Sequence, residues 1–150
     1  MRHLDHDYVN DLIQRVRRIP ADAEPKWGSM SPQELVQHLV MTVKYSMGHA
    51  GKTKVTGGWF AKNILGPLIM HGFVKIPRNI RLPKRAIDAQ RSQEHADLET
   101  FHAVLNQYLD LVQAGEMTPE PHPFFGDIGI DGWDKMHIRH FEHHLAQFGV

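Results

Sequence analysis

The stretch Ser31-Pro-Gln-Glu-Leu-Val-Gln-His-Leu-Val-Met-Thr-Val-Lys-Tyr-Ser-Met47 decides the fold because it contains the clearest helix start in the chain. Ser31 suits the N-cap, Pro32 the first helical position, and Glu34 the second half of a capping box. We therefore predict a helix over residues 32–47. Its apolar residues recur at helical spacing and form one buried face, so this helix packs against others.

The same periodicity predicts three further helices. The first covers roughly residues 4–16, with Asp5 or Asp7 as its cap and Pro20 as its stop. The third covers about residues 90–114, and the last follows Asp131, a suitable cap. No convincing strand-like alternation appears, so the fold class is all-α. The 150 residues have the length of one ordinary domain, and we expect a single domain over residues 1–150.

The connection between the second and third helices, residues 48–89, is unusually long. It is interrupted by Gly57-Gly58, Gly66-Pro67 and two further prolines, although residues 59–65 are apolar enough for a short extra helix. Loops in helical bundles usually take about 2–8 residues. A connection of this length predicts either a crossover that lets the two helices run in the same direction or a lid over a site.

Charge and composition exclude several classes of function. The 17 basic and 17 acidic residues cancel, so we expect neither a nucleic-acid nor a membrane partner. Residues 35–87 nevertheless contain nine Lys or Arg and no Asp or Glu. This basic segment either attracts an anionic small-molecule substrate or is an ordinary solvated loop, which is the better interpretation for any single residue. The absence of cysteine excludes disulfides and thiolate ligands, and the polar N-terminus favours a cytoplasmic protein.

The last predicted helix contains a cluster of histidines. His140 and His144 lie one turn apart, so both imidazoles can point at one site, and His137 lies within the same sector of about 100°. His143 lies outside that sector. A single histidine is more often an ordinary hydrogen-bonded residue, but three on one face favour a shared metal ion. Each unsatisfied buried polar group would otherwise cost about 1–3 kcal/mol.

A metal site with an open position usually takes three protein ligands, so a third is expected from another helix. The best candidate is His38, at the border of the buried face of the second helix. Its rivals are His95 and His102 on the third helix. The remaining histidines outside the cluster are expected to be solvated or to cap turns: His3, His6, His49, His71 and His122.

Further residues are candidates for the surroundings of the site. Gln147 follows His144 by almost one turn and either orients a ligand or is simply solvated, with equal weight on the two. His137 and Tyr45 are candidates for supporting a ligand or facing the substrate. Glu142 lies on the opposite face and is expected to be solvated.

Two segments together resemble the DinB/YfiT-like superfamily, and most closely a branch of uncharacterised function. They are Trp27-Gly-Ser-Met-Ser-Pro-Gln-Glu-Leu-Val-Gln-His38 and His140-Phe-Glu-His-His144-Leu-Ala-Gln147-Phe-Gly149, with His122-Pro-Phe-Phe-Gly126 between them. The resemblance implies an up-down-down-up four-helix bundle. It also implies a three-histidine metal site, matched here by His38, His140 and His144, with zinc or nickel as the ion.

The relatives implied by this resemblance include metal-dependent hydrolases and transferases or isomerases that use a low-molecular-weight thiol, often as homodimers. The leading hypothesis is therefore an enzyme with a divalent ion whose open position takes water or thiol. A second hypothesis is a non-catalytic metal-binding or stress-response module with a structural or sensory ion. A third is a helical bundle without metal, in which His140 and His144 bond only to protein groups.

Overall fold

The computed structural model describes residues 3–52, 54–78 and 96–150. All regular elements in these ranges are helical, and the β structure there is limited to an isolated bridge between His122 and Gly126. None of the described helices is both long and apolar enough to cross a bilayer. The elements are α1 (His6–Arg17), α2 (Pro32–Ser46), the π-helical turn η1 (Ala61–Leu65), α3 (Gly66–Met70), α5 (Leu98–Ala114) and α6 (Gly129–Phe148). The all-α prediction is confirmed for these residues.

The starts of α1 and α2 follow from their caps. The side chain of Asp5 accepts a hydrogen bond from Tyr8 N at 2.8 Å. At α2 the predicted capping box is present, since Ser31 Oγ accepts from Glu34 N and Glu34 Oε2 accepts from Ser31 N. Each bond satisfies an N–H that has no partner within the helix.

The predicted starts of the last two long helices were wrong. α5 begins at Leu98 because the side chain of Asp97 caps it by accepting from Thr100 N; residues 90–95 of the predicted helix lie outside the described residues. Asp131 does not cap α6 but lies in its first turn, 2.6 Å from Lys135 Nζ. The N–H of Gly129, where α6 begins, donates instead to Asp127 Oδ1.

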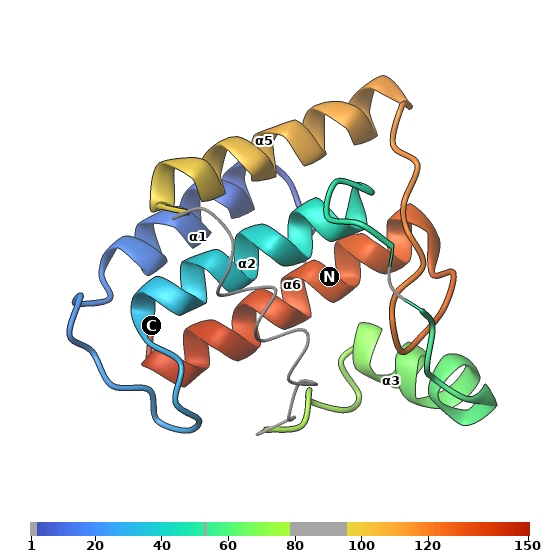
Figure 1. The fold of residues 1–150 in the computed structure, drawn as a ribbon, viewed down its shortest axis with the longest axis horizontal. Helices are drawn as coiled ribbons and strands as arrows, with labels where there is room; N and C mark the ends of the chain where they lie inside the picture. Colours follow the sequence, from blue (N-terminus) through green and yellow to red (C-terminus); the bar gives the residue numbers. More distant parts are fainter. Residues whose placement is uncertain (1–2, 53, 79–95) are drawn as a thin grey trace.

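The four long helices lie side by side (Figure 1). α2 packs against α5 and α6, and α1 packs against the same two helices. Figure 1 shows that α2 and α5 run in one direction and that α1 and α6 run in the other. The long connection thus leads from the end of α2 to a helix that runs parallel to it, which is the crossover, one of the two alternatives that its length predicted.

The connection contains a helix that continues beyond its predicted end. Helical backbone runs from Trp59 to Met70, straight through Gly66-Pro67, where a break was expected. Gly66 N donates to Ala61 O, a π-type bond that skips one carbonyl, and proline has no N–H to donate. α3 packs on α6 through a small second core of Ile69, Phe125, Trp133 and Met136.

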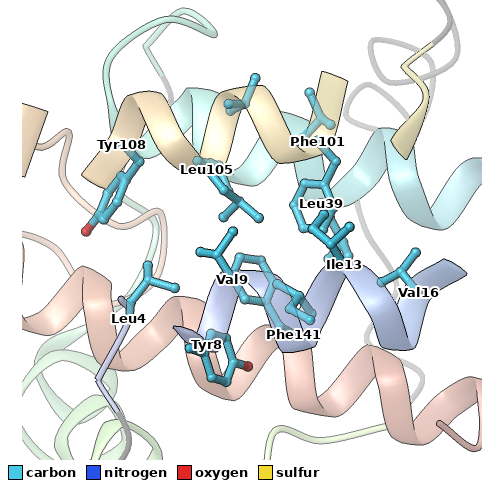
Figure 2. Close-up of a cluster of buried hydrophobic side chains, with 14 of the residues drawn as sticks. Leu4, Tyr8, Val9, Ile13, Val16, Leu39, Phe101, Leu105, Tyr108 and Phe141 are labelled. Carbon is cyan, nitrogen blue, oxygen red and sulfur yellow. The ribbon is translucent and has the colours of Figure 1, made fainter. Parts of the chain in front are cut away.

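The main core fixes how α6 is rotated. Buried side chains from α1 and α5 point toward Phe141 of α6, and the rings of Phe101 and Phe141 meet edge to face at 5.8 Å (Figure 2). Burial of each such side chain contributes about 1.5–3 kcal/mol. Because Phe141 points into this core, its neighbour His140 lies on the side of α6 that meets α2.

Glu142 is not simply solvated, so that expectation was wrong. Its carboxylate accepts hydrogen bonds from Tyr8 Oη and from both terminal nitrogens of Arg15, at 2.9–3.0 Å. Arg15 also donates to the carbonyl of Val150. This half-buried network ties the end of α6 to α1.

Candidate metal centre

Three histidines from two helices bring one ring nitrogen each to a common point. The Nε2 atoms of His38 and His140 lie 2.9 Å apart, and those of His140 and His144 lie 3.0 Å apart. The candidate ligand atoms of all three residues lie within 4.8 Å of one another. His38 comes from the middle of α2, whereas His140 and His144 come from successive turns of α6. This group could hold a metal ion.

The orientation of Gln147 fixes the tautomer of His144. Gln147 Nε2 donates to the carbonyl of Trp27 at 2.8 Å, so its Oε1 faces His144 Nδ1, also at 2.8 Å. An amide oxygen only accepts, so Nδ1 carries the hydrogen and the Nε2 of the neutral ring presents a lone pair to the group. That is the arrangement in which a histidine binds a metal while its other nitrogen is held by a protein acceptor.

Hydrogen bonds alone do not account for both short contacts of His140 Nε2, one with His38 and one with His144. His140 Nε2 carries either one hydrogen or one lone pair, yet it faces two other Nε2 atoms at hydrogen-bond distance. If its hydrogen points at the lone pair of His144, it does not also point in line at His38. A cation at the common point would accept all three lone pairs.

The separations fit a small divalent ion. Imidazole nitrogens bind zinc at about 2.0–2.1 Å, so two ligands on one ion are separated by about 3 Å or slightly more. The observed 2.9 and 3.0 Å approach this value. Within the described ranges, the buried Nδ1 atoms of His140 and of His137 both have no hydrogen-bond partner, so this feature does not distinguish the group.

Burial keeps the two candidate ligands on α6 neutral at ordinary pH. Desolvation lowers the pKa of His144 to about 4, despite the opposing effect of the hydrogen bond that His144 donates to Gln147. Desolvation, and then the neighbouring His144 and His38, also place the pKa of His140 well below its usual value. A neutral imidazole is the form that binds metal, so no proton has to be displaced near pH 7.

His137 is not brought into the three-histidine group. It is fully buried, its Nε2 lies 2.9 Å from Ser46 Oγ, and its ring stacks between Trp133 and Phe141. Ser46 Oγ already donates to Val43 O at 2.7 Å, so it accepts from His137. Desolvation lowers the pKa of His137 to about 3. We call these surroundings the aromatic box of His137.

Tyr45 also lies away from the group. Its hydroxyl donates to Pro121 O at 2.8 Å, and its ring lies 6.1 Å from that of Trp133. His122 organises the nearby turn, since its Nδ1 accepts from the backbone N–H of Phe124 and of Phe125. Desolvation lowers its pKa to about 4. His122 therefore caps a turn, one of the two roles expected for it.

The other histidines contribute no ligand to the group as far as the described residues extend. His102 is half-buried on α5, and the rival His95 falls outside the described residues. His3, His6, His49 and His71 are exposed. His143 lies outside the group and meets the ring of Trp27 edge to face at 5.6 Å.

Sequence reasoning missed the contribution of the loop before α2. The carbonyl of Trp27 holds Gln147, and the guanidinium of Arg78 lies 4.1 Å from the centre of the Trp27 ring. A cation over an aromatic face at this distance is attractive. Helical periodicity carries no signal for either contact, because Trp27 and Arg78 both lie outside the helices.

Comparison with known proteins gives a family but no activity. Residues 1–149 match the model of a family described as "Protein of unknown function (DUF1569)". No curated protein and no solved structure matches the chain.

Proposed function

The chain belongs to the DUF1569 family, and we propose that it is a metal-dependent enzyme in which His38, His140 and His144 hold one divalent ion. The observation that carries this proposal is the convergence of three Nε2 atoms with separations of 2.9 and 3.0 Å in two of the pairs. Zinc or nickel suits a site made only of imidazoles. The reaction is hydrolysis or transfer to a low-molecular-weight thiol, with a small anionic substrate.

Coordination number favours catalysis over a purely structural ion. A structural zinc site usually has four protein ligands, whereas catalytic sites have three and an open position. The group contains three candidate ligands among the residues that the structure describes. A divalent ion held by neutral imidazoles would supply Lewis acidity that lowers the pKa of a coordinated water to about 7 and deprotonates a coordinated thiol.

The protein's own residues have distinct roles in this proposal. Gln147 keeps the lone pair of His144 directed at the ion, and Trp27 in turn keeps Gln147 oriented. Arg78, over the Trp27 ring, places a positive charge on the loop side of the site. An anionic substrate is attracted by that charge.

We further propose that α1, α2, α5 and α6 form the up-down-down-up bundle of the DinB/YfiT-like superfamily. The parallel course of α2 and α5 supports this assignment (Figure 1). So does the ligand set, with one histidine from the second long helix and two spaced by four on the last.

Elemental analysis of the purified protein tests the metal. We expect about one zinc or nickel per chain in the wild type and none in His140→Ala or His144→Ala. The matched control is His143→Ala, which removes a neighbouring imidazole of the same helix and should retain the ion. Equal metal content in His143→Ala and His144→Ala would contradict the proposed ligand set.

Cobalt substitution then tests the open position. The visible spectrum of the Co²⁺ protein should change when azide or a low-molecular-weight thiol is added, because an exogenous ligand enters the coordination sphere. A spectrum that does not respond to either ligand would indicate a closed shell and a structural or sensory ion. A thiol that raises the melting temperature of the metal-loaded form alone would favour transferase chemistry.

A further inference from the structure

Large apolar side chains are exposed where the helix of the connection meets the turn before α6. Trp59 is 72% exposed, Phe60 60% and Phe124 43%. Ile64, one turn after Phe60, is also exposed. A soluble protein seldom exposes several neighbouring aromatic side chains without an interaction that uses them. We call these four residues the aromatic patch.

Two backbone contacts hold the halves of the aromatic patch together. Thr56 N donates to Pro123 O at 2.8 Å. At Gly57, a Cβ atom would lie only 1.6 Å from the carbonyl oxygen of Phe124, so any side chain there would force the segments apart. Trp59 and Phe60 therefore follow directly after a segment that is closely packed against Phe124.

The chain segment that contains Trp59 and Phe60 carries lysine and no acidic residue. Lys52, Lys54 and Lys62 are exposed in the same part of the chain, and residues 35–87 contain no acid. The aliphatic part of Lys62 lies against Gly126, beside the patch. The acid that follows, Asp127, accepts a hydrogen bond from Gly129 N. The zero net charge of the whole chain thus hides a local excess of lysine.

We propose that the aromatic patch and its lysines dock on an anionic lipid bilayer. Trp and Phe side chains are suited to the boundary between headgroups and acyl chains, and each nearby lysine is attracted by anionic headgroups. A second copy of this chain fits less well, because a two-fold contact at this patch would bring lysines against lysines. The expectation of no membrane partner rested on the net charge of the whole chain, which does not report this local excess of lysine. Docking is peripheral and independent of the metal.

Vesicle co-sedimentation tests the proposal with the full chain. We expect binding to vesicles with about a third phosphatidylserine, weak binding to pure phosphatidylcholine, and a loss of binding as salt rises. Trp59 emission should shift to the blue on binding, because its indole leaves water. Trp59→Ala/Phe60→Ala should abolish sedimentation while retaining helical circular dichroism and metal content.

Charge variants distinguish docking on anionic lipid from nonspecific hydrophobic adsorption. Lys54→Gln/Lys62→Gln should weaken binding by about 25-fold, or about fivefold per lysine. The matched control, Arg17→Gln/Arg18→Gln, removes two exposed charges at the far end of α1 and should bind as the wild type does. Equal binding to both vesicle types, or equal losses in the two charge variants, would overturn the proposal. So would a dimer in sedimentation velocity that is lost in Trp59→Ala/Phe60→Ala without any vesicle binding.

Discussion

The three-histidine group and the aromatic box of His137 lie one turn apart on α6, and both contain buried histidine. They differ in what the imidazole nitrogens face. His137 gives its N–H to Ser46 and is covered by rings. His38, His140 and His144 point nitrogens at one another. Burial lowers the pKa in both regions. Burial and a lowered pKa are therefore common to both regions, and the convergence of ring nitrogens is what distinguishes the group that could hold a metal ion.

The largest contrast is expected between alanine variants of His140 and His137. His140→Ala should lose the ion but cost the metal-free protein little, because it relieves a crowded set of nitrogens. His137→Ala should retain the ion and lower the free energy of unfolding by about 2–4 kcal/mol, because it leaves a cavity among aromatic rings. Metal analysis and urea denaturation with chelator measure the two effects. The distinction fails if both variants lose metal and stability together.

The next prediction concerns the support of His144. Gln147→Leu removes the acceptor of the Nδ1 hydrogen and should weaken metal binding by about 10–100-fold. Gln147→Glu retains an acceptor oxygen for Nδ1 but loses the hydrogen bond to the carbonyl of Trp27, so it should recover only part of that loss. Competition with a chromophoric chelator gives the affinities. If the two variants bind equally, Gln147 does not orient the ligand.

Stability of the metal-free protein should depend on pH through the buried histidines. The pKa of His137 is about 3 in the fold, whereas an unfolded histidine titrates near 6.5. The unfolded state therefore binds one more proton at this residue between those values, and stability falls as pH decreases from about 6.5 toward 3. His137→Phe should reduce the slope by about 1.4 kcal/mol per pH unit in that window. Urea midpoints at several pH values, with chelator, measure this slope; an unchanged slope would contradict the prediction.

The smallest effect is expected at Tyr45, which bonds Pro121 rather than any metal ligand. Tyr45→Phe should cost about 1 kcal/mol through the lost hydrogen bond and leave metal affinity unchanged. A fall in metal affinity would contradict this prediction, and it would show that Tyr45 couples the surroundings of His137 to the three-histidine group.

Sequence reasoning succeeded where the signal is local. The box of Ser31 and Glu34 located the start of α2, and the spacing of four placed His140 and His144 together. His38 was chosen as a candidate ligand from its place on a helix face, and the structure brings its Nε2 to 2.9 Å from that of His140. Periodicity also placed His137 on the same helix face as the candidate ligands His140 and His144. It could not show that His137 would instead donate a hydrogen bond to Ser46.

The errors arise from contacts between distant segments and from competing local bonds. Glu142 looked solvated because its partners, Tyr8 and Arg15, come from the first helix. Gly66-Pro67 looked like a break because a π-type bond cannot be foreseen from the two residue types alone. Asp131 was preferred as a cap although Asp127 takes the N–H at the start of α6. Each of these three predictions depended on which of several available hydrogen-bond partners a group uses in the folded protein.

The distance along the chain between His38 and His140 has a consequence for biosynthesis. The two residues are 102 positions apart, and His38 lies on a helix made early. At about 5–20 residues per second, a ribosome needs roughly 5–20 s to make the residues between them. A nascent chain that ends before α6 therefore presents a lone imidazole rather than a chelate. Under the proposed ligand set, metal binding has to wait for α6, so a chain truncated before this helix is expected not to retain the ion.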